Sequence, residues 1–446
     1  MKLLSKQTGI LFLWISFLWI ISCSPDNRNN EETKTDESKP FDSIHLAKQS
    51  QHGIYVPEGF EVSLFAEETG RGRHLVVSES GVVYVLLRQP NNEGCLVALK
   101  DTDSDGKADE KEYFGEHCGR GSVEIHKGYL YFSTDSSILR LPLPEEGLIP
   151  SGDPEVIAEG FEYHGQHGNK NFAFDNAGNL YVNSGAPANA CQEQMRTPGS
   201  SGQDPCPILE RFGGVWKFKD DVPNQKQMEE GERFTTGVRN LVAINFNPAV
   251  NKLYAVQHGR DQLHQFFPEF YTAKESSELP AEEFILMEEG DDFGWPYCYY
   301  DPFKDKKVLA PEYGGDGDSV GRCADKKDPI LDFPGHYAPN DLEFYTASQF
   351  PDMYKNGAFI AFHGSWNRGE FGQEGFNVVF VPFDGELPIG KWYVFADGFD
   401  GGGKIQGAGD AEYRPTGVTV GPDGSLFVID SKKGRIWKIS YKENMS

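Results

Sequence analysis

Short apolar runs recur along the chain, and each follows a tight turn that carries Gly or Asn. The first run, Val-Val-Tyr-Val-Leu at 82–86, follows Ser80-Gly81. A turn of this kind before a β-branched and aromatic run is typical of a β-hairpin. The pattern therefore predicts six hairpins. The other five turns are Lys127-Gly128, Ala177-Gly178, Asn251-Lys252, Asn356-Gly357 and Asp423-Gly424.

A second strand-like run follows several of these hairpins, as at 137–142 and 434–439. Long amphipathic helical patterns are scarce, and 50 Gly and 27 Pro interrupt them. Six such units at irregular spacing predict an all-β fold, a six-bladed β-propeller with long inter-strand insertions. A β-sandwich or a solenoid is the alternative, which the aromatic-rich repeat and the chain length disfavour. The loops of all blades would meet at one end of a central channel, so distant residues can share a site.

The N-terminal pattern indicates export. Lys2 and Lys6 precede an apolar run at 9–21, which is too short for a comfortable transmembrane helix and fits a signal peptide. The run ends at Ile-Ile-Ser-Cys, which resembles a bacterial lipobox, whose cysteine is lipidated. An ordinary signal peptide with an unrelated cysteine is the alternative.

The chain is therefore expected to have three parts. These are a signal peptide at 1–22, a lipidated Cys23 with a flexible tether at 23–50, and the propeller at 51–446. Within the tether, residues 24–40 contain no apolar side chain large enough to pack. The lipobox resemblance implies an exported protein with a lipid anchor in a bacterial membrane, on its periplasmic or outer-membrane face.

Charge and cysteine content narrow the function further. The net charge of −26 argues against nucleic acid as a partner, because nucleic acids require basic patches. Six cysteines remain besides Cys23, and an even number in an exported chain favours disulfides, with free core thiols as the alternative. No Cys-x-x-Cys-His motif is present to attach a c-type haem. The pairs expected from local spacing are Cys95–Cys118, Cys191–Cys206 and Cys298–Cys323, although other connectivities are open.

The segment at 101–112 matches a calcium-binding loop. Oxygen-bearing residues recur at alternate positions, Gly106 permits a sharp turn, and the final Glu can bind through both oxygens. The preceding residues are strand-like, so a structural calcium loop between two strands is expected instead of a helical calcium sensor. A polar hairpin without metal is the alternative. The expected ligands are Asp101, Asp103, Asp105, Lys107 (through its backbone), Asp109 and Glu112.

Several further segments place polar groups beside glycine turns. Together they offer histidine bases, fixed cations and exposed carbonyls around one channel mouth, a set that suits a carboxylate-rich cofactor held by arginine side chains. The segments lie at 164–171, 236–240, 257–261, 292–296, 363–368 and 413–415.

These segments resemble the PQQ-dependent soluble glucose and sorbosone dehydrogenases and the fungal pyranose dehydrogenase propellers. The resemblance covers 56–441 and rests on the order of three motifs: Gly-x-Arg-Asn at 237–240, Gly-Trp-Pro at 294–296 and His-Gly-Ser-Trp-Asn-Arg at 363–368. It implies a propeller that binds pyrroloquinoline quinone (PQQ) and Ca²⁺ and oxidises a sugar, sugar aldehyde or polyol. Electrons would pass to an external acceptor, a cytochrome or a quinone.

The resemblance also implies roles for single residues. His167 matches the catalytic base, with His164 as the second choice. Arg239 and Asn240 match the pair that holds PQQ and its reactive carbonyl, and Arg239 would also stabilise the charge that develops there. Arg414 matches an arginine that contacts the PQQ carboxylates.

The metal ligands and further cofactor contacts follow in the same way. Gly259 and Arg260 match two backbone carbonyls that bind the catalytic calcium. His258 stands where glucose dehydrogenases carry glutamine, so the packing of the cofactor would differ there. Asn367 and Arg368 stand where those enzymes carry Lys-Arg, which leaves the role of the lysine in doubt. The remaining cofactor-binding cations expected are Arg73 and Lys170.

Two other functions remain open for such a propeller. A calcium-dependent hydrolase or lactonase would hold its metal through inward carboxylate and amide side chains and needs no ring of arginines. A non-catalytic carbohydrate-binding propeller would keep the fold without the chemistry, and the departures at His258 and Asn367 leave it possible.

Overall fold

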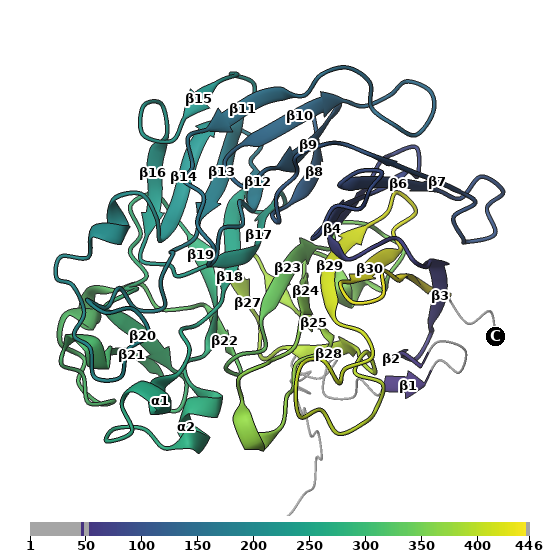
Figure 1. Ribbon diagram of the computed structural model, residues 1–446. Helices are drawn as coiled ribbons and strands as arrows, with labels where there is room; N and C mark the ends of the chain where they lie inside the picture. The colour runs from purple at the N-terminus through teal and green to yellow at the C-terminus, as the bar shows by residue number, and fades with distance from the viewer. Residues whose placement is uncertain (1–45, 49–52, 443–446) are drawn as a thin grey trace, which may run out of the picture. The chain divides into compact units, whose positions relative to one another are not determined.

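Six sheets arranged in a ring form the described part of the chain, and their strands are antiparallel except for one short parallel pair in the second sheet (Figure 1). The computed structural model describes residues 46–48 and 53–442. The predicted signal peptide, Cys23 and the tether as far as residue 45 lie outside these residues. Leu46–Lys48, within the predicted tether, forms strand β1 and pairs with β2 (Tyr55–Pro57).

Each blade contains at least four strands, and the fold class predicted from sequence is confirmed. Blade one contains β4 (Gly72–Val77), β5 (Val83–Leu87), β6 (Leu96–Lys100) and β7 (Glu110–Phe114). Blade two contains β8 (Val123–His126), β9 (Tyr129–Ser133), β10 (Ile138–Pro142), β11 (Glu155–Glu159) and β15 (Gln225–Lys226). Blade three contains β12 (Phe172–Phe174), β13 (Asn179–Ser184), β14 (Gly214–Lys219) and β16 (Glu232–Thr236).

The other three blades complete the ring. Blade four contains β17 (Leu241–Asn247), β18 (Lys252–Gln257), β19 (Glu282–Met287) and β22 (Leu331–Phe333). Blade five contains β23 (Pro339–Phe344), β24 (Ala358–Phe362), β25 (Val378–Val381) and β28 (Tyr393–Ala396). Blade six contains β29 (Pro415–Val420), β30 (Leu426–Asp430), β31 (Ile436–Tyr441) and β3 (Phe60–Ala66).

The six turns found in the sequence all lead into the second strand of a blade: β5, β9, β13, β18, β24 and β30. Lys127 and Gly128 show why, since both have positive φ, at 48° and 79°. Two such residues make the tight turn whose twist matches a β-hairpin. The first strands of neighbouring blades contact one another and line the centre of the ring.

The ring is closed by the first long strand of the chain. Strand β3 pairs with β31, from Phe60 opposite Tyr441 to Ala66 opposite Ile436. Apolar side chains fill the space between blades. The Phe60 ring meets Phe395 of blade five edge to face, with ring centroids 5.0 Å apart. Backbone pairing therefore holds the two ends of the propeller together, and aromatic packing joins blade six to blade five.

The insertions lie mainly beside blades three and four, and all three predicted disulfides are present: Cys95–Cys118, Cys191–Cys206 and Cys298–Cys323. No helix in the described part of the chain is long and apolar enough to cross a membrane. The insertions hold α1 (Leu263–Phe266), α2 (Ala273–Glu278), β20 (Cys298–Asp301), β21 (Lys306–Leu309), β26 (Phe383–Asp384) and β27 (Leu387–Pro388). Short 3-10 turns are η1 (Pro207–Glu210), η2 (Pro311–Tyr313), η3 (Gly321–Asp325), η4 (Asp352–Tyr354) and η5 (Gly369–Phe371).

Candidate functional site

A cavity of about 250 Å³ gathers several of the predicted residues from loops that are far apart in sequence. His167, Arg239, His258, Gly259 and Asn367 all line it. Those loops precede or follow strands of blades two to five, as expected for residues at one end of a propeller channel. The remaining lining residues are Gln166, Arg196, Asp261, Glu282, His336, Ala338 and Trp366.

The imidazole of His167, the predicted base, is held in its neutral form. Its Nδ1 lies 2.7 Å from the carbonyl oxygen of Ala186. Burial, followed by the charge of Arg239, lowers the pKa of His167 well below its usual value of 6.5. A neutral ring in this setting donates from Nδ1 to Ala186 and leaves the lone pair of Nε2 free. Of the two predicted histidines, His164 is not part of the cavity lining.

The backbone around His167 requires a glycine opposite it. His167 itself has a φ of 50°. A Cβ on Gly185 would lie 2.5 Å from the carbonyl oxygen of His167 and 2.9 Å from Oδ1 of Asn240. Only glycine therefore allows these two predicted site residues to approach the start of the loop after β13.

Arg239 is fixed by two hydrogen bonds from its guanidinium. Nη1 donates to the carbonyl oxygen of Gly259 at 2.7 Å, and Nη2 donates to Oδ2 of Asp261 at 2.7 Å. Its Nε, like Oδ1 of the neighbouring Asn240, is buried without a partner among the described residues. Both atoms remain available to a bound ligand.

Asp261 contacts several residues of the site, and no role was predicted for it from the sequence. Besides Arg239, its carboxylate accepts from Nδ2 of Asn367 at 2.8 Å. Nδ1 of His336 is 3.9 Å from it. Its position directly after Gly259 and Arg260, in a segment already singled out, was the signal that could have identified it.

Glu282 was also missed. It is the first residue of β19, where a charged residue is expected to face solvent, but it is only 2% exposed. Its carboxylate accepts from the backbone N–H groups of Gly259 at 2.7 Å and Ala338 at 3.2 Å. Burial raises the pKa of Glu282 to about 8. His258, across the cavity, has its pKa lowered by burial to about 4, and its Nε2 lies 2.7 Å from the carbonyl oxygen of Pro339.

Arg73 and Arg414 belong to a second cationic group outside this cavity lining. Arg73 donates from Nε to the carbonyl oxygen of Arg120 at 3.1 Å, and Arg414 donates to the carbonyl oxygens of His363 and Gly364 at 2.8 and 2.7 Å. Burial, and then the charge of the nearby Arg88, lower the pKa of Arg73 to about 9 and that of Arg414 to about 10. Neither has a carboxylate ion-pair partner within the described residues. Both lower the pKa of His363.

Three other predicted residues are engaged elsewhere. The Lys170 ammonium is buried and donates to the carbonyl oxygen of Gly168 at 2.9 Å. Arg368 donates to Oε1 of Glu278 at 2.9 Å and does not line the cavity. Arg260, whose backbone carbonyl was the predicted ligand, buries its side chain in an ion pair with Glu312. None of these side chains reaches the base in this structure.

The predicted calcium loop joins β6 and β7, so the strand-like flanks are confirmed. Carboxylate oxygens of Asp101, Asp103 and Asp109 lie within 4.8 Å of one another. Asp105 accepts from the backbone N–H of Lys107, at 2.8 Å. The final residue, Glu112, lies within β7 opposite Ala98. Calcium binding by this loop stays a prediction.

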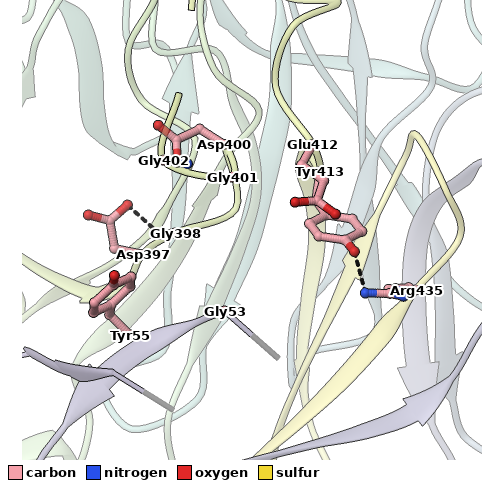
Figure 2. Close-up of a pocket in the computed structure, with 10 residues that line it drawn as sticks. All are labelled: Gly53, Tyr55, Asp397, Gly398, Asp400, Gly401, Gly402, Glu412, Tyr413 and Arg435. Atoms are coloured by element: carbon pink, nitrogen blue, oxygen red, sulfur yellow. Dashed lines mark hydrogen bonds between the residues drawn. The ribbon is translucent and has the colours of Figure 1, made fainter. Parts of the chain in front are cut away.

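A larger cavity of about 590 Å³ lies beside β2 and β28 (Figure 2). Its polar side chains include Asp397, Asp400 and Glu412, and Arg435 donates to the hydroxyl of Tyr413. None of the residues predicted for catalysis or cofactor binding lines it. Size alone therefore does not identify the candidate site, and the smaller cavity holds the predicted base His167.

Comparison with known proteins shows which family the chain matches. A family model described as TrAA12-like matches residues 54–442. The structure of Trichoderma reesei carbohydrate-active enzyme family AA12 aligns with a TM-score of 0.70 and 17% identity, covering 89% of this chain and 100% of that chain. The holo pyranose dehydrogenase PQQ domain from Coprinopsis cinerea aligns with a TM-score of 0.70 and 16% identity, covering 88% and 98%. At this low sequence identity, the two alignments show a shared fold and no more.

Two further relatives are more distant or partial. The apo form of the soluble aldose sugar dehydrogenase from Escherichia coli aligns with a TM-score of 0.54 and 17% identity, covering 86% of this chain and 100% of that chain. A Borreliella burgdorferi protein described as uncharacterized is 28% identical over 208 residues, which are 46% of this chain and 48% of that protein. The chain thus matches about half the length of that relative.

Proposed function

Because the chain belongs to the TrAA12-like family, we propose that it is a PQQ- and calcium-dependent oxidoreductase that oxidises a hydroxyl of a sugar, sugar aldehyde or polyol. The observation that carries the proposal is the neutral base His167, held beside Arg239 in one cavity. A hydroxyl substrate needs a base that is unprotonated at neutral pH, and a developing oxyanion needs a fixed cation.

The residues present fit an anionic cofactor such as PQQ. Neither Arg73 nor Arg414 has a carboxylate within ion-pair distance among the described residues. Burial lowers the pKa of each, and the charge of Asp341 offsets this only in part, for Arg73. Burying a guanidinium in this way is unfavourable unless a ligand supplies negative charge. The partnerless buried Nε of Arg239 and Oδ1 of Asn240 are further contacts that such a ligand would satisfy.

The residues also fit a hard divalent cation. The carbonyl of Gly259 and the carboxylates of Asp261 and Glu282 line the same cavity. Calcium prefers oxygen donors of these kinds. Burial raises the pKa of Glu282 to about 8, and a bound cation would favour its ionised form.

The protein's own part in the reaction follows from these positions. Nε2 of His167 takes the proton of the substrate hydroxyl, while Ala186 keeps the ring oriented through Nδ1. Arg239, oriented by Gly259 and Asp261, stabilises negative charge that develops at the reacting centre. When bound, PQQ supplies the electron sink that takes up the hydride from the substrate carbon, and calcium supplies Lewis-acid polarisation.

Reconstitution tests the proposal. The purified protein is mixed with PQQ and calcium, PQQ binding is followed by absorbance, and dye reduction is measured against aldoses, ketoses and sugar aldehydes. We expect tight PQQ binding and sugar-dependent dye reduction that is lost in His167→Ala. Failure to bind PQQ in the presence of calcium would overturn the proposal in favour of a propeller hydrolase, lactonase or carbohydrate-binding protein.

We further propose that the protein acts outside the cytoplasm of a bacterium, attached to a membrane through a lipid on Cys23, and passes its electrons to a cytochrome or quinone. The apolar run and the lipobox-like residues before Cys23 support the anchor. Cys23→Ser should abolish incorporation of radiolabelled fatty acid and release the protein from the membrane fraction. Unchanged labelling would contradict the anchor without affecting the proposed reaction.

A further inference from the structure

The cavity carries one cation for which the proposed reaction has no role. Arg196 lines the cavity and stands on the loop closed by the Cys191–Cys206 disulfide. Its guanidinium donates from Nη2 to Oε1 of Gln166 at 3.1 Å and from Nη1 to Oε1 of Gln262 at 2.5 Å. Both partners are neutral amides, so they orient the guanidinium without neutralising it.

Arg196 also lies close to the reacting centre. Gln166, which accepts its hydrogen bond, directly precedes the base His167. Nη2 of Arg196 is 3.7 Å from Oδ2 of Asp261, the oxygen to which Arg239 donates at 2.7 Å. A substrate group bound to Arg196 would therefore lie beside the hydroxyl that His167 deprotonates.

At Arg196, guanidinium groups outnumber the carboxylates within ion-pair distance. Asp261 is the only carboxylate within ion-pair distance of Arg196 among the described residues, and it is shared with Arg239. The other carboxylate of the lining, Glu282, faces the backbone N–H groups of Gly259 and Ala338. One carboxylate therefore faces two guanidinium groups, in a chain whose net charge is −26.

An aromatic surface completes the arrangement. Trp366 lines the same cavity and is 58% exposed, although its neighbour Ser365 is fully buried. An exposed indole offers an apolar face with a polar edge, which suits the C–H face of a sugar ring. The cavity thus combines a base, a surface for a ring and a cation without a carboxylate of its own.

We propose that Arg196 selects sugar acids, namely uronic or aldonic acids, by binding their carboxylate while His167 acts on a hydroxyl of the same molecule. This inference rests on the oxidoreductase function proposed above and names its class of substrate. A planar guanidinium can bind a carboxylate through two parallel hydrogen bonds, which gives both affinity and orientation.

The test compares sugars that differ only in charge. Values of kcat/KM are measured for galacturonate against galactose and for glucuronate against glucose, with PQQ, calcium and a dye. Binding of the same sugars to the protein is measured separately by titration calorimetry. The variants are Arg196→Gln, Arg196→Lys, which keeps the charge, and the control Arg211→Gln, which removes an arginine that pairs with Glu162 outside the cavity.

We expect the protein to prefer the acid over its neutral counterpart. Arg196→Gln should lower the acid-to-neutral ratio of kcat/KM about 10- to 100-fold, the range of a charged hydrogen bond. Arg196→Lys should keep part of the preference, and Arg211→Gln all of it. Equal kcat/KM for the acid and the neutral sugar in the unmodified protein would overturn the inference. An acid-to-neutral ratio that is unchanged in Arg196→Gln would overturn it too.

Failure of the inference can be told apart from failure of the proposed function. Oxidation of neutral sugars without any preference for acids refutes only the role of Arg196. If no sugar is oxidised, the proposed function fails, and calorimetry still tests the role of Arg196. Tighter binding of the acid that is lost in Arg196→Gln supports the site, and equal binding of the acid and the neutral sugar refutes it.

Discussion

The imidazole of His167 owes its neutrality to neighbours that the fold supplies. Burial and the guanidinium of Arg239 lower its pKa, while Asp261 and the carbonyl of Ala186 act in the opposite direction. The lowering effects dominate, so the ring accepts a proton at neutral pH without first having to lose one. The charge state of Arg239 and Asp261 therefore tunes the base as well as the geometry of the cavity.

Removing the base should stop turnover without unfolding the protein. His167→Ala is expected to lower kcat about 10²- to 10⁴-fold, the range for loss of a general base. PQQ binding and the thermal unfolding midpoint should change little. His117→Ala, at a side chain that is 92% exposed, is the matched control and should retain full activity.

The acidic limb of the pH–rate profile reports the same base. Because the pKa of His167 is lowered, activity should persist as the pH falls below 6.5 and decline only as the pH passes through the lowered value. Arg239→Gln removes a cause of the lowering and should shift the limb to higher pH, whereas Asp261→Asn should shift it to lower pH. Histidine ¹⁵N NMR titration checks both directions without turnover. An unchanged limb in both variants would contradict the coupling.

Sequence alone identified the residues of the site that carry a motif, and missed those that only the fold brings inward. Arg239 and Asn367 lie in two of the ordered motifs, and His167 lies in the polar segment at 164–171; all three line the cavity. Glu282 begins a strand, where a charged residue usually faces solvent, and its burial depends on the backbone of Gly259 and Ala338, which lies against the start of β19. Arg368 lies in a motif but does not line the cavity, and its guanidinium donates to Glu278 instead.

At the level of elements, the blades were predictable and the insertions were not. Each hairpin carries its own turn and apolar run, so local pattern determines it. The loop from Cys191 to Cys206 has no such pattern, and its course depends on contacts with distant segments. Tyr297, for example, accepts through its hydroxyl from the backbone N–H of Cys206 at 2.8 Å. Such long-range contacts cannot be read from neighbouring residues.

The disulfide in that loop should contribute measurably to stability. Its cysteines are 15 residues apart, and cross-linking a loop of this size contributes about 3 kcal/mol by restricting the unfolded chain. The double variant Cys191→Ser/Cys206→Ser is expected to lose about this much in urea unfolding. Ser200→Ala, within the same loop, serves as the control. An unchanged unfolding midpoint would refute the expectation.

Across the whole molecule, the inner strands bring carboxyl groups together at the centre of the ring. On β23, Asp341 is buried and Glu343 is half-buried, and desolvation raises the pKa of each to about 8. Glu124 of β8 has its pKa raised by burial and by these two residues. Asp341 accepts from the backbone N–H of Val418 in blade six at 2.9 Å, which links neighbouring blades.

These carboxyl groups predict a pH dependence of stability. Between pH about 4 and about 8, the folded state keeps protons that the unfolded state has released, so stability falls as the pH rises through this window. The double variant Asp341→Asn/Glu343→Gln should flatten the decrease of the melting temperature between pH 6 and 8, measured without PQQ or calcium. Glu58→Gln, at an exposed position, is the control. An equally steep decrease in the double variant would refute the prediction.

The pairing of β3 with β31 also governs the order in which the protein can be completed during synthesis. Blade six takes one strand from the start of the propeller and three from its end. A nascent chain can form its hairpins as they emerge, but β3 has no partner strand in blade six until β31 has been synthesised. Until then the growing ring keeps an open edge, and an open edge recruits strands from other chains. Synthesis of β31 therefore closes this edge, and a chain truncated before β31 would carry a permanent site for aggregation.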